Sequence, residues 1–145
     1  MEIVRANDDD IKAITKLALL LWPDNVESVL TKEFSELILD KKAIIFLAKE
    51  EDNEIGFAQC QLRMDYVEGT ESSPVGYLEG IFVKEEYRRN GVAKQLLLAC
   101  EKWAKGKGCT EFASDIELEN SVSLEFHLRN GFKEANRIIC LTKKL

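Results

Sequence analysis

The spacing of apolar positions in the first part of the chain predicts a short strand followed by two helices. Residues 3–5 alternate like a strand, and residues 7–10 carry side chains that can cap a helix. The helix that follows has an apolar face formed by Ile11, Ile14, Leu17, Ala18 and Leu21. Pro23 ends it, because proline cannot continue the helical hydrogen-bond ladder. A second helix is predicted by Leu30, Phe34, Leu37 and Ile38.

The middle of the chain predicts a run of strands. Residues 43–48 have the continuous apolar character of a buried strand, and residues 55–64 pair back against them as a hairpin after a polar turn. Residues 66–73 form a polar loop. Pro74 then begins a strand that extends to Val83.

The last part of the chain returns to helical spacing and then to strands. A third helix has a core stripe and ends at two glycines, Gly106 and Gly108; the stripe consists of Val92, Leu96, Cys100 and Trp103. Residues 109–115 predict a strand, and a fourth helix begins at Asn120. After Gly131 the chain predicts a final strand through Ile138, Ile139 and Leu141.

This order of elements, β-α-α-β-β-β-α-β-α-β, predicts an α/β fold of the α+β type. The sheet is expected to be mixed, twisted and mostly antiparallel, with helices on both faces. A doubly wound nucleotide-binding fold is the competing architecture, but its glycine-rich signatures Gly-x-Gly-x-x-Gly and Gly-x-x-x-x-Gly-Lys-Ser/Thr are both absent.

Length and charge narrow the class further. A chain of 145 residues with 46% hydrophobic content suits one domain, residues 1–145. The net charge of −6 disfavours nucleic acid as a partner, although Lys84, Arg88, Arg89 and Lys94 form a local basic cluster. No apolar run approaches the roughly 18 residues that span a bilayer, and no signal peptide is evident, so we expect a cytoplasmic protein without a membrane partner.

The cysteines argue against a metal site. Cys60, Cys100, Cys109 and Cys140 are widely spaced, form no Cys-x-x-Cys pair and share the chain with a single histidine. We therefore expect no metal, and we expect these residues to be buried reduced thiols.

A possible anion site lies where the strand ending at Val83 meets the third helix. A charged turn separates them, and residues 88–91 read Arg-Arg-Asn-Gly. The first backbone N–H groups of a helix have no partner within the helix, and the helix dipole adds partial positive charge there. Glycine lets a ligand approach the main chain. The segment predicts a phosphate or pyrophosphate site, although a simple helix-capping turn would have the same local sequence.

Arg88, Gly91 and Ala93 fit Arg-x-x-Gly-x-Ala, the pattern with which the GNAT N-acetyltransferase superfamily binds the pyrophosphate of coenzyme A. Residues 120–132 resemble a second element of that superfamily, Asn-x-x-small-x-x-x-Tyr-x-x-x-Gly-Phe, with His127 at the tyrosine position. The resemblance implies a GNAT fold and acetyl-CoA as cosubstrate. It also implies cofactor contacts from Ile81, Phe82, Val83, Arg88, Arg89, Asn90, Gly91, Val92, Ala93 and Asn120.

The tyrosine of many relatives protonates the leaving thiolate of coenzyme A. An imidazole can do the same, since its unperturbed pKa lies near 6.5. His127 is therefore either a general acid or a histidine packed in a hydrogen-bonded core. Asn120 can bond the cofactor and also suits the start of a helix.

A narrower resemblance covers essentially the whole chain. Leu21-Trp22-Pro23, residues 65–70, 72–75 and 78–83, and Phe112-Ala113-Ser114-Asp115 together are similar to chromosomal aminoglycoside 6′-N-acetyltransferases. In that family the residues matching Trp22, Tyr66, Glu79 and Asp115 contact the amino sugar. Its closest patterns carry an acidic residue where this chain has Asn136, so the resemblance leaves the substrate range open.

Physical chemistry supports these substrate roles. Aminoglycosides are polycations, and a pocket for them needs carboxylates to pair with ammonium groups and aromatic faces to cover the sugar. Glu79 and Asp115 are predicted on neighbouring strands, where they would bind the substrate and act as catalytic bases, through water, on its amine. Asn136 can still hydrogen-bond a sugar hydroxyl or ammonium.

The expected mechanism is direct attack of a primary amine on the thioester. Pantetheine would pair with the strand edge at residues 81–83, and a main-chain N–H near Phe82 or Val83 would stabilise the oxyanion. Acetylation of another amine, such as a polyamine or a protein amino terminus, is the alternative; a non-catalytic coenzyme A-binding regulator and a purely structural partner module remain further options. The resemblance also implies a homodimer.

Overall fold

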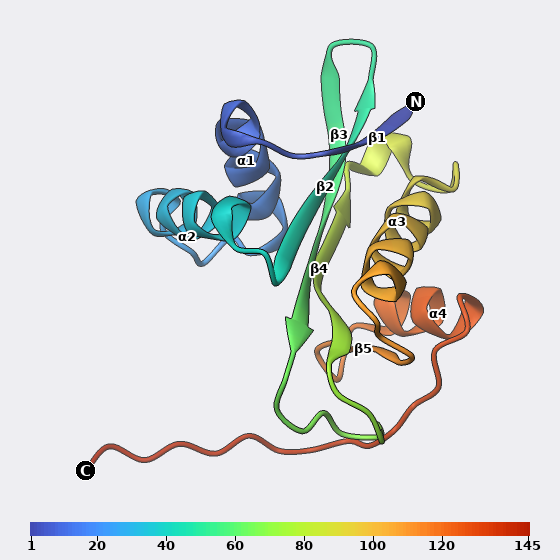
Figure 1. Ribbon diagram of the computed structural model, residues 1–145. Coiled ribbons are helices and arrows are strands. Elements are labelled where there is room, and N and C mark those ends of the chain that lie inside the picture. Colours follow the sequence, from blue (N-terminus) through green and yellow to red (C-terminus); the bar gives the residue numbers. More distant parts are fainter.

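A computed structural model describes residues 1–145 as a five-stranded sheet with helices on both faces (Figure 1). The strands lie in the order β1-β2-β3-β4-β5; the first three pairings are antiparallel, and β4 pairs with β5 in parallel. The predicted mixed, mostly antiparallel sheet is therefore confirmed. Its elements are β1 (Glu2–Arg5), α1 (Ile11–Leu21), α2 (Glu27–Leu39), β2 (Ala43–Glu50), β3 (Asn53–Arg63), β4 (Val75–Val83), α3 (Val92–Gly106), β5 (Phe112–Ser114) and α4 (Ser121–Arg129), with short 3-10 turns at Asp8–Asp10 and Glu85–Tyr87.

Two hydrophobic clusters fill the space between the sheet and its helices. On one face, α1 and α2 bury Ile14 and Phe34 against Phe57 of β3. On the other face, α3 buries Leu96 and Cys100 against β2, β3 and β4. Figure 1 shows these two layers on opposite sides of the twisted sheet. No helix is long and apolar enough to cross a membrane.

The entry into α1 is held by a capping box. The Asn7 side chain accepts from the backbone N–H of Asp9 (2.9 Å), and the Asp10 carboxylate accepts from that of Asn7 (3.0 Å). Lys49 of β2 donates to the same carboxylate at 2.9 Å. Burial raises the pKa of Asp10, but the Asn7 and Lys49 hydrogen bonds outweigh burial and lower it overall. The helix ends at Leu21, ahead of Pro23 as predicted.

A β-bulge interrupts the pairing of β3 with β4. Gln59 lies opposite Gly80, whereas the next residue, Cys60, lies opposite Leu78. Glu79 is therefore the extra residue on β4, without a partner across the ladder. Bulges bend a strand and redirect a side chain, and they are frequent beside active sites.

β4 also separates from β5 next to this bulge. The parallel pairing covers only residues 76–78 of β4 and 112–114 of β5. The strand predicted over residues 109–115 is thus shorter, because the backbone N–H of Cys109 bonds the Ala104 carbonyl at the end of α3 (3.0 Å). Beyond Leu78, the edge of β4 that faces away from β3 has no strand beside it.

The predicted final strand is wrong for this structure. Residues 130–145 contain no strand; Phe132 packs against the core and Ala135 against Gly69, and the chain then runs away from the body as an extended tail (Figure 1). Ile138, Ile139 and Leu141 are 72%, 87% and 86% exposed. Their apolar spacing favours a strand, but a strand forms only where another strand and a buried face receive it.

The cysteines differ from the prediction at one position. Cys60, Cys100 and Cys109 are buried free thiols, whereas Cys140 lies exposed in the tail. A hydrogen bond with the Cys60 thiol and burial raise the pKa of Cys100, which keeps the Cys100 thiol protonated and unreactive. Cys140 is exposed because the tail has no partner in the single chain.

Candidate active site

Glu79 lies at the bulge of β4 and is held by an arginine of the neighbouring strand. Arg63, the last residue of β3, donates from Nε to one Glu79 oxygen (3.0 Å) and from a terminal nitrogen to the other (2.9 Å). This two-pronged geometry fixes the plane of the carboxylate. Both Glu79 oxygens are thereby engaged, while the side chain retains 20% exposure.

Asp115 follows the end of β5 and is held by Tyr77 of β4. The buried Tyr77 hydroxyl donates to one Asp115 oxygen, and the Arg63 guanidinium lies 3.5 Å above the Tyr77 ring centroid. Burial, and then the hydrogen bond to Asp115, raise the pKa of Tyr77 far above its usual value. Arg63, Tyr77, Glu79 and Asp115 thus form one connected group, here called the carboxylate cluster.

The two predicted catalytic residues of the cluster are connected by Arg63 and Tyr77. The sequence analysis did not predict a role for either of these two residues. Gln59, Gln61 and Arg63 repeat polar side chains at every second position near the end of β3, a spacing that marks a polar strand face. Tyr77 shares its strand with Glu79, two positions away. These signals place polar groups near Glu79 but do not predict the Arg63 pairing, which depends on the β3–β4 register.

Trp22 packs over Gly80, the residue that follows Glu79, and its role as a substrate contact stays a prediction. Its indole covers the backbone of Gly80, where an added Cβ would lie 2.6 Å from the ring. The ring also meets Phe57 edge-on at 6.1 Å between centroids. The indole is therefore held over β4 at Gly80, with part of its surface open to solvent.

No hydrogen bond joins the side chain of Tyr66 or Asn136 to the cluster. Tyr66 is 72% exposed in the loop between β3 and β4. Asn136 lies in the tail, where its amide donates to Glu68 of the same loop at 3.4 Å. Ala135 packs against Gly69, so the tail crosses this loop. Their substrate roles remain predictions.

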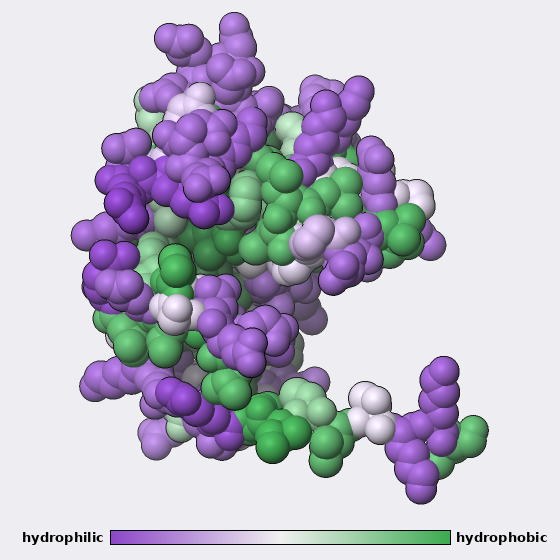
Figure 2. All heavy atoms as spheres, turned by 180° about the vertical axis from the view of Figure 1, so that it is seen from behind, coloured by the Kyte–Doolittle hydropathy of each residue, from purple (hydrophilic) through white to green (hydrophobic).

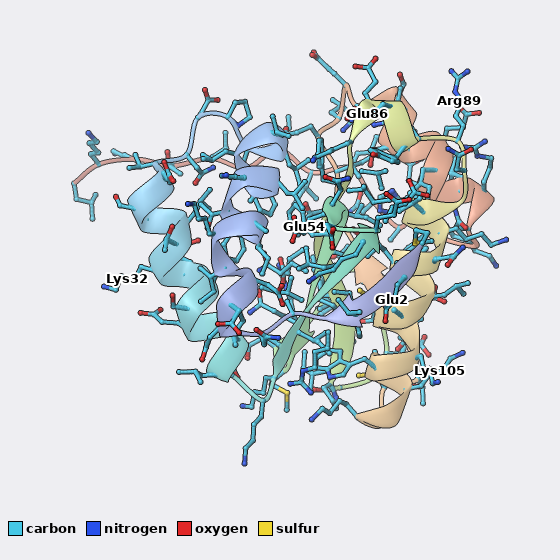
Figure 3. The ribbon with its side chains drawn as sticks, turned by 90° about the horizontal axis from the view of Figure 1, so that it is seen from above. Glu2, Lys32, Glu54, Glu86, Arg89 and Lys105 are labelled. Atoms are coloured by element: carbon cyan, nitrogen blue, oxygen red, sulfur yellow. The ribbon has the colours of Figure 1, made fainter.

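The turn into α3 has the geometry that an anion site requires. Arg89 and Gly91 both adopt positive φ, 65° and 77°, and no side chain caps the helix at Gly91. A Cβ built on Gly91 meets nothing within 4 Å, so space is open above the first turn. Arg89 points outward beside this turn (Figure 3). The residues present fit a pyrophosphate group bound by main-chain N–H groups.

The other predicted residues of this turn, residues 88–93, have different surroundings. Arg88 donates from Nε to the Val83 carbonyl (2.8 Å), and Asn90 reaches the Tyr87 carbonyl at 3.5 Å. Val92 is buried and Ala93 packs against the same core. The side chains of Val92 and Ala93 therefore serve the core, which leaves their backbone N–H groups for a ligand.

The open edge of β4 adjoins this turn. Ile81 and Val83 pack toward α3, Phe82 packs toward α1, and the strand pairs with β3 along its other edge. An extended chain of amides can add to such an edge as a strand would. The edge runs from the carboxylate cluster to the turn before α3, so it connects the two parts of the site.

α4 holds the remaining predicted residues. The Asn120 side chain accepts from the Ser123 backbone N–H (3.1 Å), which confirms it as the helix N-cap. His127 is buried, its Nδ1 lies 2.7 Å from the Ser123 carbonyl, and its Nε2 lies 3.2 Å from the Ser114 hydroxyl. A carbonyl only accepts, so Nδ1 carries a proton. This geometry matches the hydrogen-bonded core position, and a general-acid role stays a prediction.

A family model described as Acetyltransferase (GNAT) family matches residues 11–132. The chain belongs to this GNAT acetyltransferase family. It is 40% identical over 145 residues to aminoglycoside N(6′)-acetyltransferase type 1 of Acinetobacter haemolyticus, covering 100% of this chain and 99% of that one. It is 38% identical to the enzyme of the same name from Salmonella typhimurium, over 99% of each chain.

Solved structures agree with this assignment. AAC(6′)-Iy in complex with the bisubstrate analogue CoA-S-monomethyl-acetylneamine is 38% identical, with a TM-score of 0.95 and coverage of 99% and 98% of the two chains. The apo aminoglycoside 6′-N-acetyltransferase AAC(6′)-IG from Acinetobacter haemolyticus is 39% identical, with a TM-score of 0.95 and coverage of 100% and 99%.

Membership in the GNAT family confirms the predicted acetyl-CoA-dependent N-acetyltransferase. The open β4 edge and the turn before α3 are the parts of this GNAT domain that suit acetyl-CoA. No group of three or more histidine, cysteine or acidic side chains is arranged to hold a metal ion. The carboxylate cluster lies at the opposite end of the β4 edge from the turn.

Proposed function

We propose that this GNAT enzyme transfers the acetyl group of acetyl-CoA to the 6′-amino group of aminoglycosides, with residues 1–145 acting as one catalytic domain. The observation that carries the proposal is the carboxylate cluster at the bulge of β4, beside the open strand edge and the Trp22 indole. Carboxylates orient ammonium groups, and the indole face suits sugar CH groups. The relatives named above carry this activity in their names.

In the proposed reaction the amine attacks the thioester carbon without a covalent enzyme intermediate. The C–N bond forms and the C–S bond breaks, so that coenzyme A leaves as its thiolate. Of the two protons that the substrate ammonium gives up, one passes to solvent and the other ends on the thiolate. If the pKa of the amine is about 10, deprotonation at pH 7 costs on the order of 4 kcal/mol. Placing amine and thioester together offsets much of this barrier.

Asp115 is the better placed of the two carboxylates to receive a proton of the amine through water. Arg63 engages both oxygens of Glu79, whereas Tyr77 engages only one oxygen of Asp115. An exposed carboxylate oxygen free of protein hydrogen bonds can accept from a bound water. Glu79, held rigidly by Arg63, orients the ammonium groups of the substrate.

Acetylation of a less charged amine, such as a polyamine or a protein amino terminus, is the second candidate. Arg63 neutralises Glu79, and Asn136 contacts Glu68 rather than the cluster. As a result, the site offers less negative charge to a polycationic sugar than two unpaired carboxylates and an acidic residue 136 would.

Steady-state kinetics on a panel of amines would separate the two candidates. The panel contains kanamycin A, spermidine and a peptide with a free amino terminus, each with saturating acetyl-CoA. We expect kcat/KM for kanamycin A to exceed the other two by at least about 100-fold, because only the sugar can use both carboxylates and the indole. Comparable or higher values for spermidine or the peptide would contradict the aminoglycoside assignment.

We further propose that the enzyme is a homodimer in the cytoplasm. The tail extends from the body with apolar residues exposed (Figure 2), and β5 is a three-residue edge strand without an outer neighbour. A second copy of the chain supplies an extended segment of the same kind, and pairing would cover both the tail and the edge. The free buried thiols and the use of acetyl-CoA support a reducing, intracellular environment.

A further inference from the structure

The Arg63 guanidinium pairs with one carboxylate of the proposed substrate site and stacks on the tyrosine that bonds the other. It bonds both oxygens of Glu79 at 3.0 and 2.9 Å, and its central carbon lies 3.5 Å from the centroid of the Tyr77 ring, whose hydroxyl donates to Asp115. The side chain is thus held on one side by a carboxylate and on another by an aromatic face. It still retains 43% exposure, so it borders the solvent that a substrate would displace.

This placement weakens the electrostatic attraction between the cluster and a cationic substrate. Glu79 and Asp115 each contribute a negative charge and Arg63 a permanent positive one, so the cluster carries a single net negative charge. The paired edge of Glu79 is filled, and an incoming ammonium must approach the carboxylate from its remaining lone pairs. Each further ammonium on a substrate therefore gains less attraction than two free carboxylates would provide.

We propose that Arg63 is a specificity-determining residue that limits how strongly the site favours acceptors with additional ammonium groups. The inference rests on the proposed function, because it concerns the acceptor of that same site. Arg63 acts through its charge beside Glu79 rather than on the reacting atoms.

A purely structural role is the competing explanation. Arg63 also ties the end of β3 to β4, and an ion pair between strands can serve the fold alone. A structural role would change activity toward all acceptors by the same factor. A charge-based role would change the ratio between two acceptors that differ by one amino group.

Kanamycin A and kanamycin B are such a pair, since kanamycin B carries an amino group where kanamycin A has its 2′-hydroxyl. The measured quantity is the ratio of kcat/KM for kanamycin B to that for kanamycin A, at low and high ionic strength. Four variants are compared with the wild-type protein: Arg63→Met, Arg63→Lys, Glu79→Gln and the double variant Arg63→Met/Glu79→Gln. The double variant has the same net cluster charge as the wild type and leaves no partner unpaired.

We expect Arg63→Met to raise the ratio by about two- to five-fold at low salt, with a smaller gain at high salt. Arg63→Lys and the double variant should keep the wild-type ratio. The step from Glu79→Gln to the double variant removes the positive charge of Arg63, so it should raise the ratio by a similar factor. This second comparison holds even where Arg63→Met alone fails to fold.

The proposal would be overturned if the kanamycin B to kanamycin A ratio were unchanged both from the wild type to Arg63→Met and from Glu79→Gln to the double variant. A loss of Arg63 that reduced activity toward both sugars by the same factor is such a result. Calorimetric titration of each sugar into the coenzyme A-bound protein gives the same ratio as affinities, without turnover. Sugar binding with the expected ratios but no acetylation would contradict the proposed function alone. Binding of neither sugar by the wild-type protein would contradict both.

Discussion

At the scale of single residues, Glu79 and Asp115 differ in how they are held, and this difference predicts different losses. Asp115→Asn removes the carboxylate that keeps a free oxygen, so kcat/KM for the acceptor should fall by about 100-fold or more. Glu79→Gln weakens the orientation of the ammonium and should reduce it by about 10-fold. Kinetics and calorimetry together should find acetyl-CoA affinity near the wild-type value in both variants.

Glu125→Gln is the matched control for these substitutions. Glu125 is an exposed carboxylate on α4 and lies outside the cluster, so its removal should leave kcat/KM unchanged. If Asp115→Asn and Glu79→Gln behave like this control, the cluster is structural and the acceptor binds elsewhere. A joint loss of acetyl-CoA binding would instead indicate misfolding.

Asp10 gives a residue-scale prediction about stability and pH. Because the folded state lowers its pKa below the ordinary value of 3.8, its contribution is present above about pH 4 and is lost as pH falls through the folded-state pKa. Asp10→Asn should therefore lower the free energy of unfolding by about 1 kcal/mol at pH 7. Urea unfolding should find a much smaller difference at pH 3.

Asp9→Asn is the control, since Asp9 is exposed and its carboxylate has no partner. It should change the free energy of unfolding little at either pH. A loss for Asp10→Asn that is equally large at pH 3 would contradict the role of the ionised carboxylate.

At the scale of elements, comparing two matched glycines separates an effect of the turn before α3 on acetyl-CoA binding from an effect of backbone strain on stability. Gly91 has φ of +77° and Gly108, beyond the end of α3, has φ of +90°; an added Cβ meets no neighbour at either position. Ala at either site should cost about 1 kcal/mol of stability, because both backbones are left-handed. Only Gly91→Ala should weaken acetyl-CoA binding, by about 10-fold, because its methyl group projects into the space for the pyrophosphate.

Calorimetric titration with acetyl-CoA decides this comparison, and thermal unfolding confirms that the two variants are equally destabilised. Equal acetyl-CoA affinities for Gly91→Ala and Gly108→Ala would remove the turn from the cofactor site.

Elements with local signals could be predicted from the sequence. Residues 7–10 and Pro23 predicted where α1 begins and ends. The apolar stripe from Val92 to Trp103 predicted α3, and the glycines after it predicted its end. The bulge at Glu79 and the pairing of Arg63 could not be predicted, because both depend on which residues of β3 and β4 lie opposite each other. Residues 138–141 have strand-like spacing but no partner within the chain, and no local pattern reveals that.

At the scale of the whole molecule, the tail predicts assembly. If residues 133–145 pair with a second copy, Ile139→Glu should place a charge in that contact and shift sedimentation from dimer toward monomer. Leu39→Glu is the control, because Leu39 is likewise a highly exposed aliphatic residue, at 79%, but lies at the end of α2. A wild-type protein that sediments as a monomer at micromolar concentration would contradict the dimer.

The position of the acetyl group in the product tests the central claim most directly. Kanamycin B offers several primary amines, and a site built from Trp22, Glu79 and Asp115 beside the β4 edge should present only one of them to the thioester. Nuclear magnetic resonance of the product made by the wild-type protein with acetyl-CoA should locate the acetyl group on the 6′-nitrogen alone. Acetylation at another ring amine, or a mixture of positions, would contradict the proposed orientation of the substrate.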